Sequence, residues 1–358
     1  MIGIIMAGGK GTRLFPLTEN KPKPLISLLG KPVIEYVKDA LVNIGIDEII
    51  LTTGYQGEGL QKIVDVWNEN SDVVFSVNQE STPMGTAGSV KLLEQKLTHS
   101  FIVASGDSVL SSDLEALVKA HKSSRAMVTM ALWEVEDPTQ FGIVGLSKTP
   151  TGDVDGKLSE GYIAKFLEKP TLDEAFSNVI NAGLYILEPE VMSYVPKGTK
   201  FDFSKELFPQ LLEVGLPMYG VKLNGVWFDV GTPKELIRAQ NHLVEHSESL
   251  PFGLPKGKHI GDSSYVIGNS ISHSKLCRTV VSENSIIGHD SKIVDTIVMS
   301  GAEVGNDCSI IGTIIGENVK IGDDCQLTDC VIGDRVEIVA GTNMHAKKVS
   351  RIISSHEP

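Results

Sequence analysis

The stretch that decides the fold lies at the start of the chain, where residues 2–25 read IGIIMAGGKGTRLFPLTENKPKPL. Ile2–Met6 is a short apolar run of the kind that forms a buried strand. A glycine-rich turn follows directly, and Gly8, Gly9 and Gly11 let the backbone turn sharply and bring its N–H groups close to an anion. The order of these features predicts a strand that leads into a phosphate-binding loop.

Two cations follow the glycines. Arg13 offers a forked guanidinium and Lys23 a point charge, and both suit phosphate oxygens. A Walker loop would end on Gly-Lys-Ser/Thr, which is missing, and a dinucleotide fold would place an acidic residue about 20 residues on, where residues 21–24 are Lys-Pro-Lys-Pro. Taken alone, the loop also fits a simple glycine-rich turn between a strand and a helix.

Beyond the loop, residues 1–245 alternate short apolar runs with amphipathic stretches, which predicts an α/β domain with a Rossmann-like, mostly parallel sheet. The predicted elements are strand Ile2–Met6, helix Pro32–Val42, strand Glu48–Thr53, helix Leu60–Glu69, strand Val73–Asn78 and strand Phe101–Ala104. Ligands of open α/β sheets bind at the carboxyl ends of strands, where the glycine loop and Asp107 both lie in this prediction. The polar, glycine-rich segment Ser147–Glu160 is predicted to be a flexible hairpin loop.

From residue 246 the pattern changes. A Ser/Pro/Gly-rich linker at 246–258 precedes a segment, 259–345, in which aliphatic residues recur six apart. These positions are Val281, Ile287, Ile293, Met299, Val298, Val304, Ile310, Ile315, Ile321 and Leu327. A hexapeptide period with one inward aliphatic per repeat predicts a left-handed parallel β-helix of about four to five coils of ~18 residues, with a tail at 346–358.

Composition bounds the class of protein. A chain of 358 residues is long enough for two domains, and its net charge of −13 argues against nucleic-acid and membrane partners, which need a basic surface. The N-terminus lacks a basic signal-peptide region and no stretch approaches ~20 apolar residues, so we expect a cytoplasmic protein. The four cysteines lack metal-site spacing and are expected to be reduced and buried.

The loop and a series of later motifs resemble the sugar nucleotidyltransferase family. Residues 8–18 (GGKGTRLFPLT), followed by PKPL at 22–25, are similar to the family signature. Further motifs appear in the family's order, at Pro83–Gly88, Gly106–Asp107, Phe141–Gly142, Glu168–Pro170, Asn181–Gly183 and Trp227–Thr232. A hexapeptide β-helix is a frequent appendage of this family, so the resemblance spans the whole chain. It implies an enzyme that joins a nucleoside triphosphate to a sugar 1-phosphate with Mg²⁺ and releases pyrophosphate.

The resemblance implies a role for each matching residue. Arg13 is expected to hold the departing pyrophosphate, Lys23 to contact the reacting phosphates and Lys169 to bind the sugar phosphate. The implied nucleotide-binding residues are Ala7, Gly8, Gly9, Gly11, Thr12, Gln79, Gly85 and Thr86, the implied sugar-binding residues are Gly142, Glu168 and Asn181, and the implied Mg²⁺ ligands are Asp107 and Asp229. The chemistry agrees, because an attack of one polyanion on another needs positioned cations and a metal more than a protein nucleophile.

The sequence indicates the nucleobase and the sugar less clearly than it indicates the reaction. Pro83–Gly88 and Val135–Gly142 look more like the mannose-1-phosphate guanylyltransferase branch than the short thymidylyltransferases, which favours GTP and mannose 1-phosphate. Glucose-1-phosphate thymidylyl- and uridylyltransferases remain alternatives, as does a non-catalytic regulatory subunit that binds nucleotide sugar. His273, His289 and His345 are expected to be surface or turn residues rather than an acyltransferase centre. The β-helix is expected to mediate a homo-oligomer.

Overall fold

The structure, a computed structural model, describes residues 1–54, 57–112, 114–249, 253–261 and 263–350. Residues 250–252 of the predicted linker and 351–358 of the predicted tail lie outside the described residues. The chain forms two compact units, of which unit 1 is Met1–Gly9 with Tyr36–Trp227 and unit 2 is Lys10–Glu35 with Phe228–Pro358. Each unit is therefore built from two stretches of chain. The domains that we predict from the sequence, 1–245 and 259–345, are instead each one continuous stretch.

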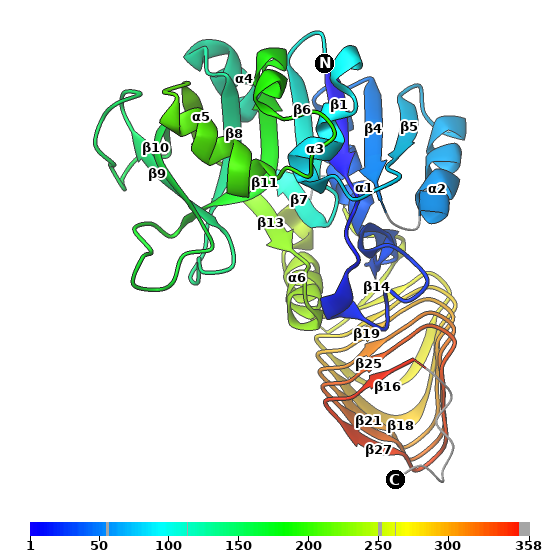
Figure 1. Ribbon diagram of the computed structural model, residues 1–358. Coiled ribbons are helices and arrows are strands. Elements are labelled where there is room, and N and C mark those ends of the chain that lie inside the picture. Colours follow the sequence, from blue (N-terminus) through cyan, green and yellow to red (C-terminus); the bar gives the residue numbers. More distant parts are fainter. Residues whose placement is uncertain (55–56, 113, 250–252, 262, 351–358) are drawn as a thin grey trace. The chain divides into compact units, whose positions relative to one another are not determined.

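Unit 1 is built on a nine-stranded sheet with the order β5-β4-β1-β6-β11-β8-β12-β10-β9 (Figure 1). Its strands are β1 (Ile2–Met6), β4 (Glu48–Thr53), β5 (Val74–Gln79), β6 (Phe101–Ser105), β8 (Val128–Glu134), β9 (Gly142–Ser147), β10 (Glu160–Glu168), β11 (Val179–Leu187) and β12 (Met218–Lys222). The four strands from β5 to β6 are parallel to their neighbours, as predicted, and β8 is parallel to β12. Antiparallel pairings join the remaining strands of this sheet. β7 (Ser108–Ser112) pairs with β13 (Gly225–Asp229) in a small second sheet.

The helices of unit 1 are α1 (Val33–Asn43), which begins in unit 2 and continues into unit 1 at Tyr36, α2 (Gly57–Glu69), α3 (Gly85–Lys91), α4 (Glu115–Ser124) and α5 (Phe208–Glu213). Short turns lie at Glu94–Lys96 and Pro189–Tyr194 and a π-turn at Phe203–Leu207. The first turn of α2 was missed from the sequence because Gly57 and Gly59 disfavour helix, yet Leu60, Val64 and Trp67 are buried along one helical face. The predicted strands and helix α1 agree with the structure to within one residue at each end. β9 and β10 pair as an antiparallel hairpin, which confirms the predicted hairpin loop.

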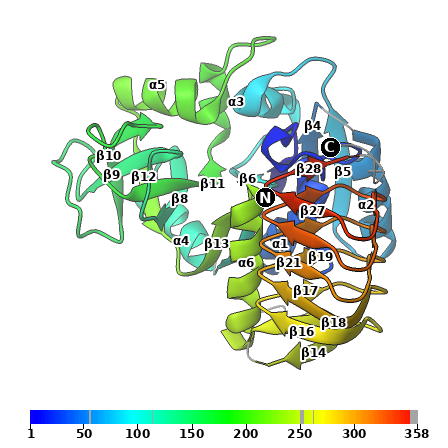
Figure 2. The same ribbon diagram turned by 90° about the horizontal axis from the view of Figure 1, so that it is seen from below.

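Unit 2 combines the loop segment, helix α6 (Pro233–Glu245) and a parallel β-helix. The loop segment holds two 3₁₀ turns (Thr12–Leu14 and Lys23–Leu25) and the strand pair β2 (Ser27–Leu28) and β3 (Lys31–Pro32), and a further turn (Ser247–Ser249) follows α6. The β-helix strands are β14 (Gly257–Ile260), β15 (Ser264–Ile267), β16 (Ile271–Cys277), β17 (Val280–Val281), β18 (Ile286–Val294), β19 (Ile297–Val298), β20 (Glu303–Val304), β21 (Ser309–Ile311), β22 (Ile314–Ile315), β23 (Lys320–Ile321), β24 (Gln326–Thr328), β25 (Val331–Ile332), β26 (Glu337–Ile338), β27 (Asn343–His345) and β28 (Lys348–Val349). Figure 2 shows the stacked coils with α6 beside them.

The β-helix confirms the predicted core and corrects its period. All ten aliphatic positions that the sequence singled out are buried. From Val281 on, however, successive coils are 17 residues apart, as in the pairs Val281↔Val298 and Ile287↔Val304, rather than the predicted ~18, and the earlier pair Val266↔Val281 is 15 apart. The reason is that one side of each coil is a residue shorter, so that Val298, not Met299, takes the core position after Ile293.

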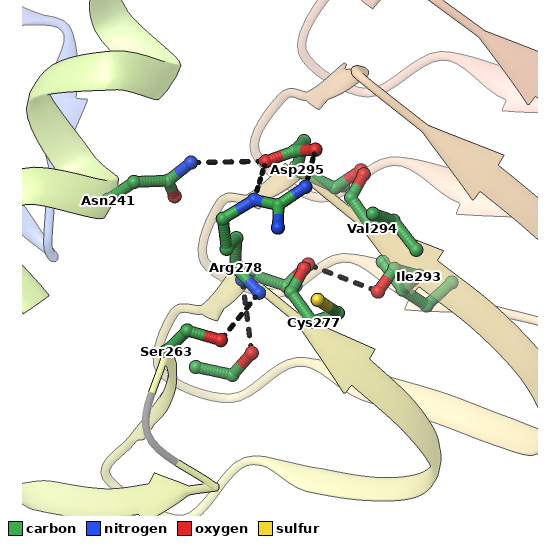
Figure 3. Close-up of polar contacts among 10 residues, drawn as sticks. Asn241, Ser263, Cys277, Arg278, Ile293, Val294 and Asp295 are labelled. Carbon is green, nitrogen blue, oxygen red and sulfur yellow. Dashed lines mark hydrogen bonds and ion pairs between the residues drawn. The ribbon is translucent and has the colours of Figure 1, made fainter. Parts of the chain in front are cut away.

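The corners of the coils explain the polar residues between the aliphatic ones. Asn284, Asp290 and Asp295 turn one coil with φ near +60°, +57° and +48°, and their equivalents on later coils are also left-handed. Short polar side chains tolerate this conformation because they bond to their own backbone. Asp295 also accepts from Asn241 Nδ2 of α6 at 3.2 Å and from Nε and Nη2 of Arg278, both at 2.6 Å (Figure 3), which ties α6 to the coils.

The cysteine and histidine predictions are largely confirmed. All four cysteines are free, and Cys308, Cys325 and Cys330 are buried, but Cys277 is only partly buried because it ends a strand beside an exposed corner. His273, His289 and His345 are exposed, as expected for surface residues. Among the described residues, every helix is too short or too polar to cross a membrane.

Candidate active site

The glycine turn of unit 1 follows β1 at the carboxyl edge of the parallel strands. The Ala7 amide donates to the carbonyl oxygen of Thr52 at 2.8 Å, so Ala7 continues the pairing of β1 with β4 and is buried. Gly8 and Gly9 lie beyond it and are exposed, and a Cβ added at Gly9 would meet no atom within 4 Å. The two glycines therefore present open backbone where ligands of parallel sheets bind.

Asp107 follows the neighbouring strand, β6. The Gly106 amide donates to the Met6 carbonyl oxygen at 2.9 Å, which keeps the end of β6 beside the end of β1. The Ser105 hydroxyl donates to Asp107 Oδ1 at 2.5 Å and orients this half-buried carboxylate. The structure thus brings Asp107 and the Gly8–Gly9 turn to one edge of the sheet, as predicted.

The residues expected to border the base have structural partners of their own. Gly85 has φ +73°, and a Cβ there would lie 2.6 Å from the Phe201 carbonyl oxygen, so only glycine fits without strain. The Thr86 hydroxyl donates to Asp202 Oδ2 and accepts from the Phe203 amide, both at 2.9 Å. Thr86 is therefore engaged in holding the turn at Phe203–Leu207, while Gln79 ends β5 and is exposed.

Gly142 and Glu168 face each other across the β9–β10 pair. A Cβ on Gly142 would lie 2.8 Å from Glu168 Oε2 and 2.6 Å from Phe166 Cζ, so the glycine makes room for the carboxylate. Burial raises the pKa of Glu168, an effect that the positive charge of Lys169 opposes. Lys169 is exposed, has φ +49° and donates its amide to the Phe141 carbonyl oxygen at 2.9 Å.

Asn181 uses its side-chain amide within the fold. Its Nδ2 donates to Tyr185 Oη at 2.8 Å and to Ser204 Oγ at 3.1 Å, and its Oδ1 accepts from the Gly183 amide at 2.8 Å. These bonds span the irregularity in the β11–β8 pairing between Asn181 and Tyr185. Burial raises the pKa of Tyr185 above its ordinary range, so this hydroxyl stays protonated. Asn181 therefore fixes the shape of β11.

In unit 2 the loop that carries the cations folds back on itself. Gly11 has φ +59°, and a Cβ there would lie 2.7 Å from Thr18 Cγ2 and 3.0 Å from Lys23 Cβ. The Thr18 hydroxyl donates to the Gly11 carbonyl oxygen at 2.9 Å and closes the loop. The glycine is needed both for its backbone conformation and for this close approach. Thr12 is exposed at the start of the first 3₁₀ turn.

Arg13, Lys23 and Asp229 gather around Gly231. Lys23 is only 7% exposed, and its Nζ lies 3.4 Å from Asp229 Oδ1. A Cβ on Gly231 would lie 2.8 Å from Arg13 Nη2 and 3.2 Å from Asp229 Oδ1, so this glycine leaves space for both groups. Two cations and one carboxylate thus lie together within unit 2, which suits the binding of phosphate groups with a metal.

The predicted site residues divide between the units. Unit 1 holds Ala7, Gly8, Gly9, Gln79, Gly85, Thr86, Asp107, Gly142, Glu168, Lys169 and Asn181, and unit 2 holds Gly11, Thr12, Arg13, Lys23 and Asp229. Within the described residues no three His, Cys, Asp or Glu side chains cluster as a metal site. Asp107 in unit 1 and Asp229 in unit 2 each offer a carboxylate, the kind of ligand that Mg²⁺ prefers.

Three residues that shape the candidate site were not predicted from the sequence. Asp202 holds the Thr86 hydroxyl, Gly231 makes room for Arg13, and Lys21 bonds to Glu317 at 2.7 Å. Gly231 lies within the Trp227–Thr232 motif and Lys21 within Lys-Pro-Lys-Pro, but their partners are distant in the chain. No local pattern could have identified those partners.

Residues 2–246 match the family model described as nucleotidyl transferase, and residues 259–353 match the model described as the GMPPB C-terminal domain. The catalytic subunit beta of mannose-1-phosphate guanylyltransferase from Xenopus tropicalis is 31% identical over 273 residues, which cover 75% of this chain and 70% of that protein. The mannose-1-phosphate guanyltransferase of Saccharomyces cerevisiae is 33% identical, with 76% and 71% covered. A UTP–glucose-1-phosphate uridylyltransferase of Synechocystis is 33% identical, with 64% and 60% covered.

A solved structure is also similar. It is the crystal structure, with sucrose, of a Bacillus anthracis protein named as a candidate glucose-1-phosphate thymidylyltransferase. The match has a TM-score of 0.58 and 25% identity, and it covers 67% of this chain and 94% of that one.

Proposed function

Because the chain belongs to the nucleotidyl transferase family and is a sugar-1-phosphate nucleotidyltransferase, we propose that it joins GTP to mannose 1-phosphate, giving GDP-mannose and pyrophosphate. Support for this pairing comes from the relatives named as mannose-1-phosphate guanylyltransferases and from the C-terminal match. The observation that carries the reaction is the grouping of Arg13, Lys23 and Asp229 around Gly231.

In the proposed reaction, a phosphate oxygen of mannose 1-phosphate forms a bond to the α-phosphorus of GTP. The bond from that phosphorus to the bridging oxygen breaks, and pyrophosphate leaves with the electron pair. Negative charge gathers at the reacting phosphates, where the buried Lys23 ammonium stabilises it, and Arg13 holds the leaving pyrophosphate. Gly8, Gly9 and Gly11 bind the nucleotide, Glu168 binds the sugar, and Lys169 binds the phosphate of the sugar.

We propose Mg²⁺ as the cofactor, with Asp107 and Asp229 as its protein ligands. Each carboxylate is half-buried. Asp107 follows β6 and Asp229 ends β13, and the metal would neutralise phosphate charge when bound. We also propose a left-handed winding of the β-helix, supported by core positions that recur every five to six residues, and the repeating faces of the coils support assembly into a homo-oligomer.

Glucose 1-phosphate with UTP or dTTP is the second candidate, favoured by the Synechocystis relative and the Bacillus anthracis structure. A non-catalytic regulatory subunit would be expected to lose Arg13, Lys23 or a metal-binding aspartate, and this chain keeps all of them.

A pyrophosphate-release screen tests the proposal. The purified chain is assayed with GTP, UTP, dTTP, ATP and CTP against mannose, glucose and N-acetylglucosamine 1-phosphates. GTP with mannose 1-phosphate is expected to give the highest kcat/KM, and a preference for glucose 1-phosphate would replace it by the second candidate. Asp107→Ala and Asp229→Ala are expected to abolish Mg²⁺-dependent release while circular dichroism stays unchanged, and full activity in both would contradict the metal assignment.

A further inference from the structure

The loop that carries Arg13 and Lys23 is attached to the last coils of the β-helix, all within unit 2. Lys21 Nζ lies 2.7 Å from Glu317 Oε1 and 2.8 Å from Asp334 Oδ2. Lys21 stands two residues before Lys23, so the ion pairs fix the backbone directly next to a proposed phosphate-binding cation.

Two further contacts hold the other end of the same loop. Lys348 Nζ donates to the backbone carbonyl oxygen of Arg13 at 2.9 Å. Gly333 packs so closely on Pro16 that a Cβ there would lie 3.1 Å from Pro16 Cβ. The loop is thus attached at three points to coils that lie more than 290 residues further along the chain.

The two carboxylates both face Lys21, and Asp334 also bonds to the neighbouring coil. Glu317 and Asp334 occupy the same position on successive coils, and Asp334 Oδ1 accepts from the Glu317 amide at 2.9 Å. Without a cation between them, two like charges stacked in this way would repel each other. Lys21 is only 15% exposed and Asp334 only 21%, so this pair is less screened by water than an ordinary surface pair.

The loop segment contributes no side chain to the β-helix core. The buried cluster of aliphatic and cysteine side chains that fills the coils contains no residue of the loop segment. A charged pair that serves only the coils exists elsewhere, between Lys320 and Glu303 at 3.9 Å, and both of its side chains are exposed.

We propose that Lys21, Glu317, Asp334 and Lys348 are positioning residues for nucleotidyl transfer, through which the last coils of the β-helix hold the phosphate loop in the shape that presents Arg13 and Lys23. The proposal rests on the proposed function and assigns the β-helix a direct part in it, besides any part in assembly.

The test uses the full chain with the substitutions Lys21→Ala, Lys21→Arg, Asp334→Asn and Lys348→Ala. Lys320→Ala, which breaks an ion pair of the same β-helix that includes no loop residue, and Lys347→Ala, beside Lys348, are the matched controls. Two quantities are measured: kcat and KM for the triphosphate, and hydrogen exchange of the amides of residues 11–25 without substrates.

Lys21→Ala is expected to speed exchange in residues 11–25 and to lower kcat/KM about tenfold, because a misplaced catalytic group costs rate steeply. Lys21→Arg should restore most of both, and Lys21→Ala combined with Asp334→Asn should be no worse than Lys21→Ala alone. The melting temperature should change no more than in Lys320→Ala.

The proposal is overturned if Lys21→Ala and Lys348→Ala match their controls in exchange and in kinetics while the wild-type chain turns over. A wild-type chain that turns over no substrate pair would instead refute the proposed function, and the exchange measurement would still report on the loop. Should Lys21→Ala fail to fold, the exposed Lys348→Ala keeps the comparison, because it removes one bond to the Arg13 carbonyl oxygen.

Discussion

The strands that carry the sugar-binding candidates and the loop that carries the phosphate-binding cations hold their side chains in different ways. Gly142, Glu168 and Asn181 lie on β9, β10 and β11, where sheet pairing and bonds to nearby residues fix them. Arg13 and Lys23 lie on a loop with only two short 3₁₀ turns, fixed by side chains from distant coils.

This difference has consequences for what substitutions do. On the strands, the backbone is held by inter-strand hydrogen bonds that a single side-chain substitution does not break. Substitutions there should therefore act locally on sugar binding. On the loop, the positions of Arg13 and Lys23 depend on individual ion pairs and close contacts. Substitutions at these contacts should therefore disturb the binding of the reacting phosphates. The largest expected effects therefore fall on the loop.

Lys23→Ala should lower kcat by about 10² to 10³, the usual cost of removing one preorganised charge from a transition state. Lys23 is buried and its Nζ lies 3.4 Å from Asp229 Oδ1, so the substitution also removes this cation from beside the carboxylate. Steady-state pyrophosphate release measures the effect, and Lys256→Ala, at an exposed position of the same unit, is the control. Equal rates in the two variants would show that Lys23 takes no part in the reaction.

Gly142→Ala should raise KM for the sugar phosphate about tenfold with little change in KM for the triphosphate, because the added Cβ lies 2.8 Å from Glu168 Oε2 and pushes the carboxylate aside. Gly156→Ala is the matched control, since a Cβ there meets nothing within 4 Å. A rise in both KM values would show that the strands and the loop respond together, and would contradict a purely local effect of the strand substitution.

Gly85→Ala should destabilise the fold more than Gly198→Ala, measured by urea unfolding. Both glycines have φ near +70°, which costs a side chain roughly 1–2 kcal/mol. Only at Gly85 does the new Cβ also meet a backbone oxygen, at 2.6 Å from that of Phe201, which should add on the order of 1–3 kcal/mol. Equal losses would mean that Phe201 moves away freely.

Much of the fold could be predicted from the sequence because it depends on local patterns. The aliphatic positions of the β-helix, the strand Ile2–Met6 and the turn after it all follow from periodicity and from glycine. The shortened side of each coil could not be predicted, because Val298 and Met299 are both apolar and the sequence does not mark which one faces inward.

The candidate site was predictable in its residue types and less so in its contacts. Asp107 and the Gly8–Gly9 turn meet at one sheet edge because parallel strands end together. The partners of Thr86 and Lys21 lie more than 110 residues away, and no spacing rule connects such residues. Only the folded chain shows that Thr86 is held by Asp202.

The smallest expected effect concerns the charge of Glu168 on the strands. Burial raises the pKa of Glu168 in the folded chain, whereas in the unfolded chain it ionises at its ordinary value. Between these two pKa values the folded chain binds more protons, so rising pH lowers stability across that window and the loss persists above it. Glu168→Gln cannot ionise, so it should unfold at higher urea than the wild type at pH 8, and the gain should vanish at a pH below the unfolded pKa. The exposed Glu190→Gln is the control. Urea unfolding without substrate measures only the stability of the folded chain. If Glu168→Gln remained more stable than the wild type at low pH, the gain would come from packing rather than from charge.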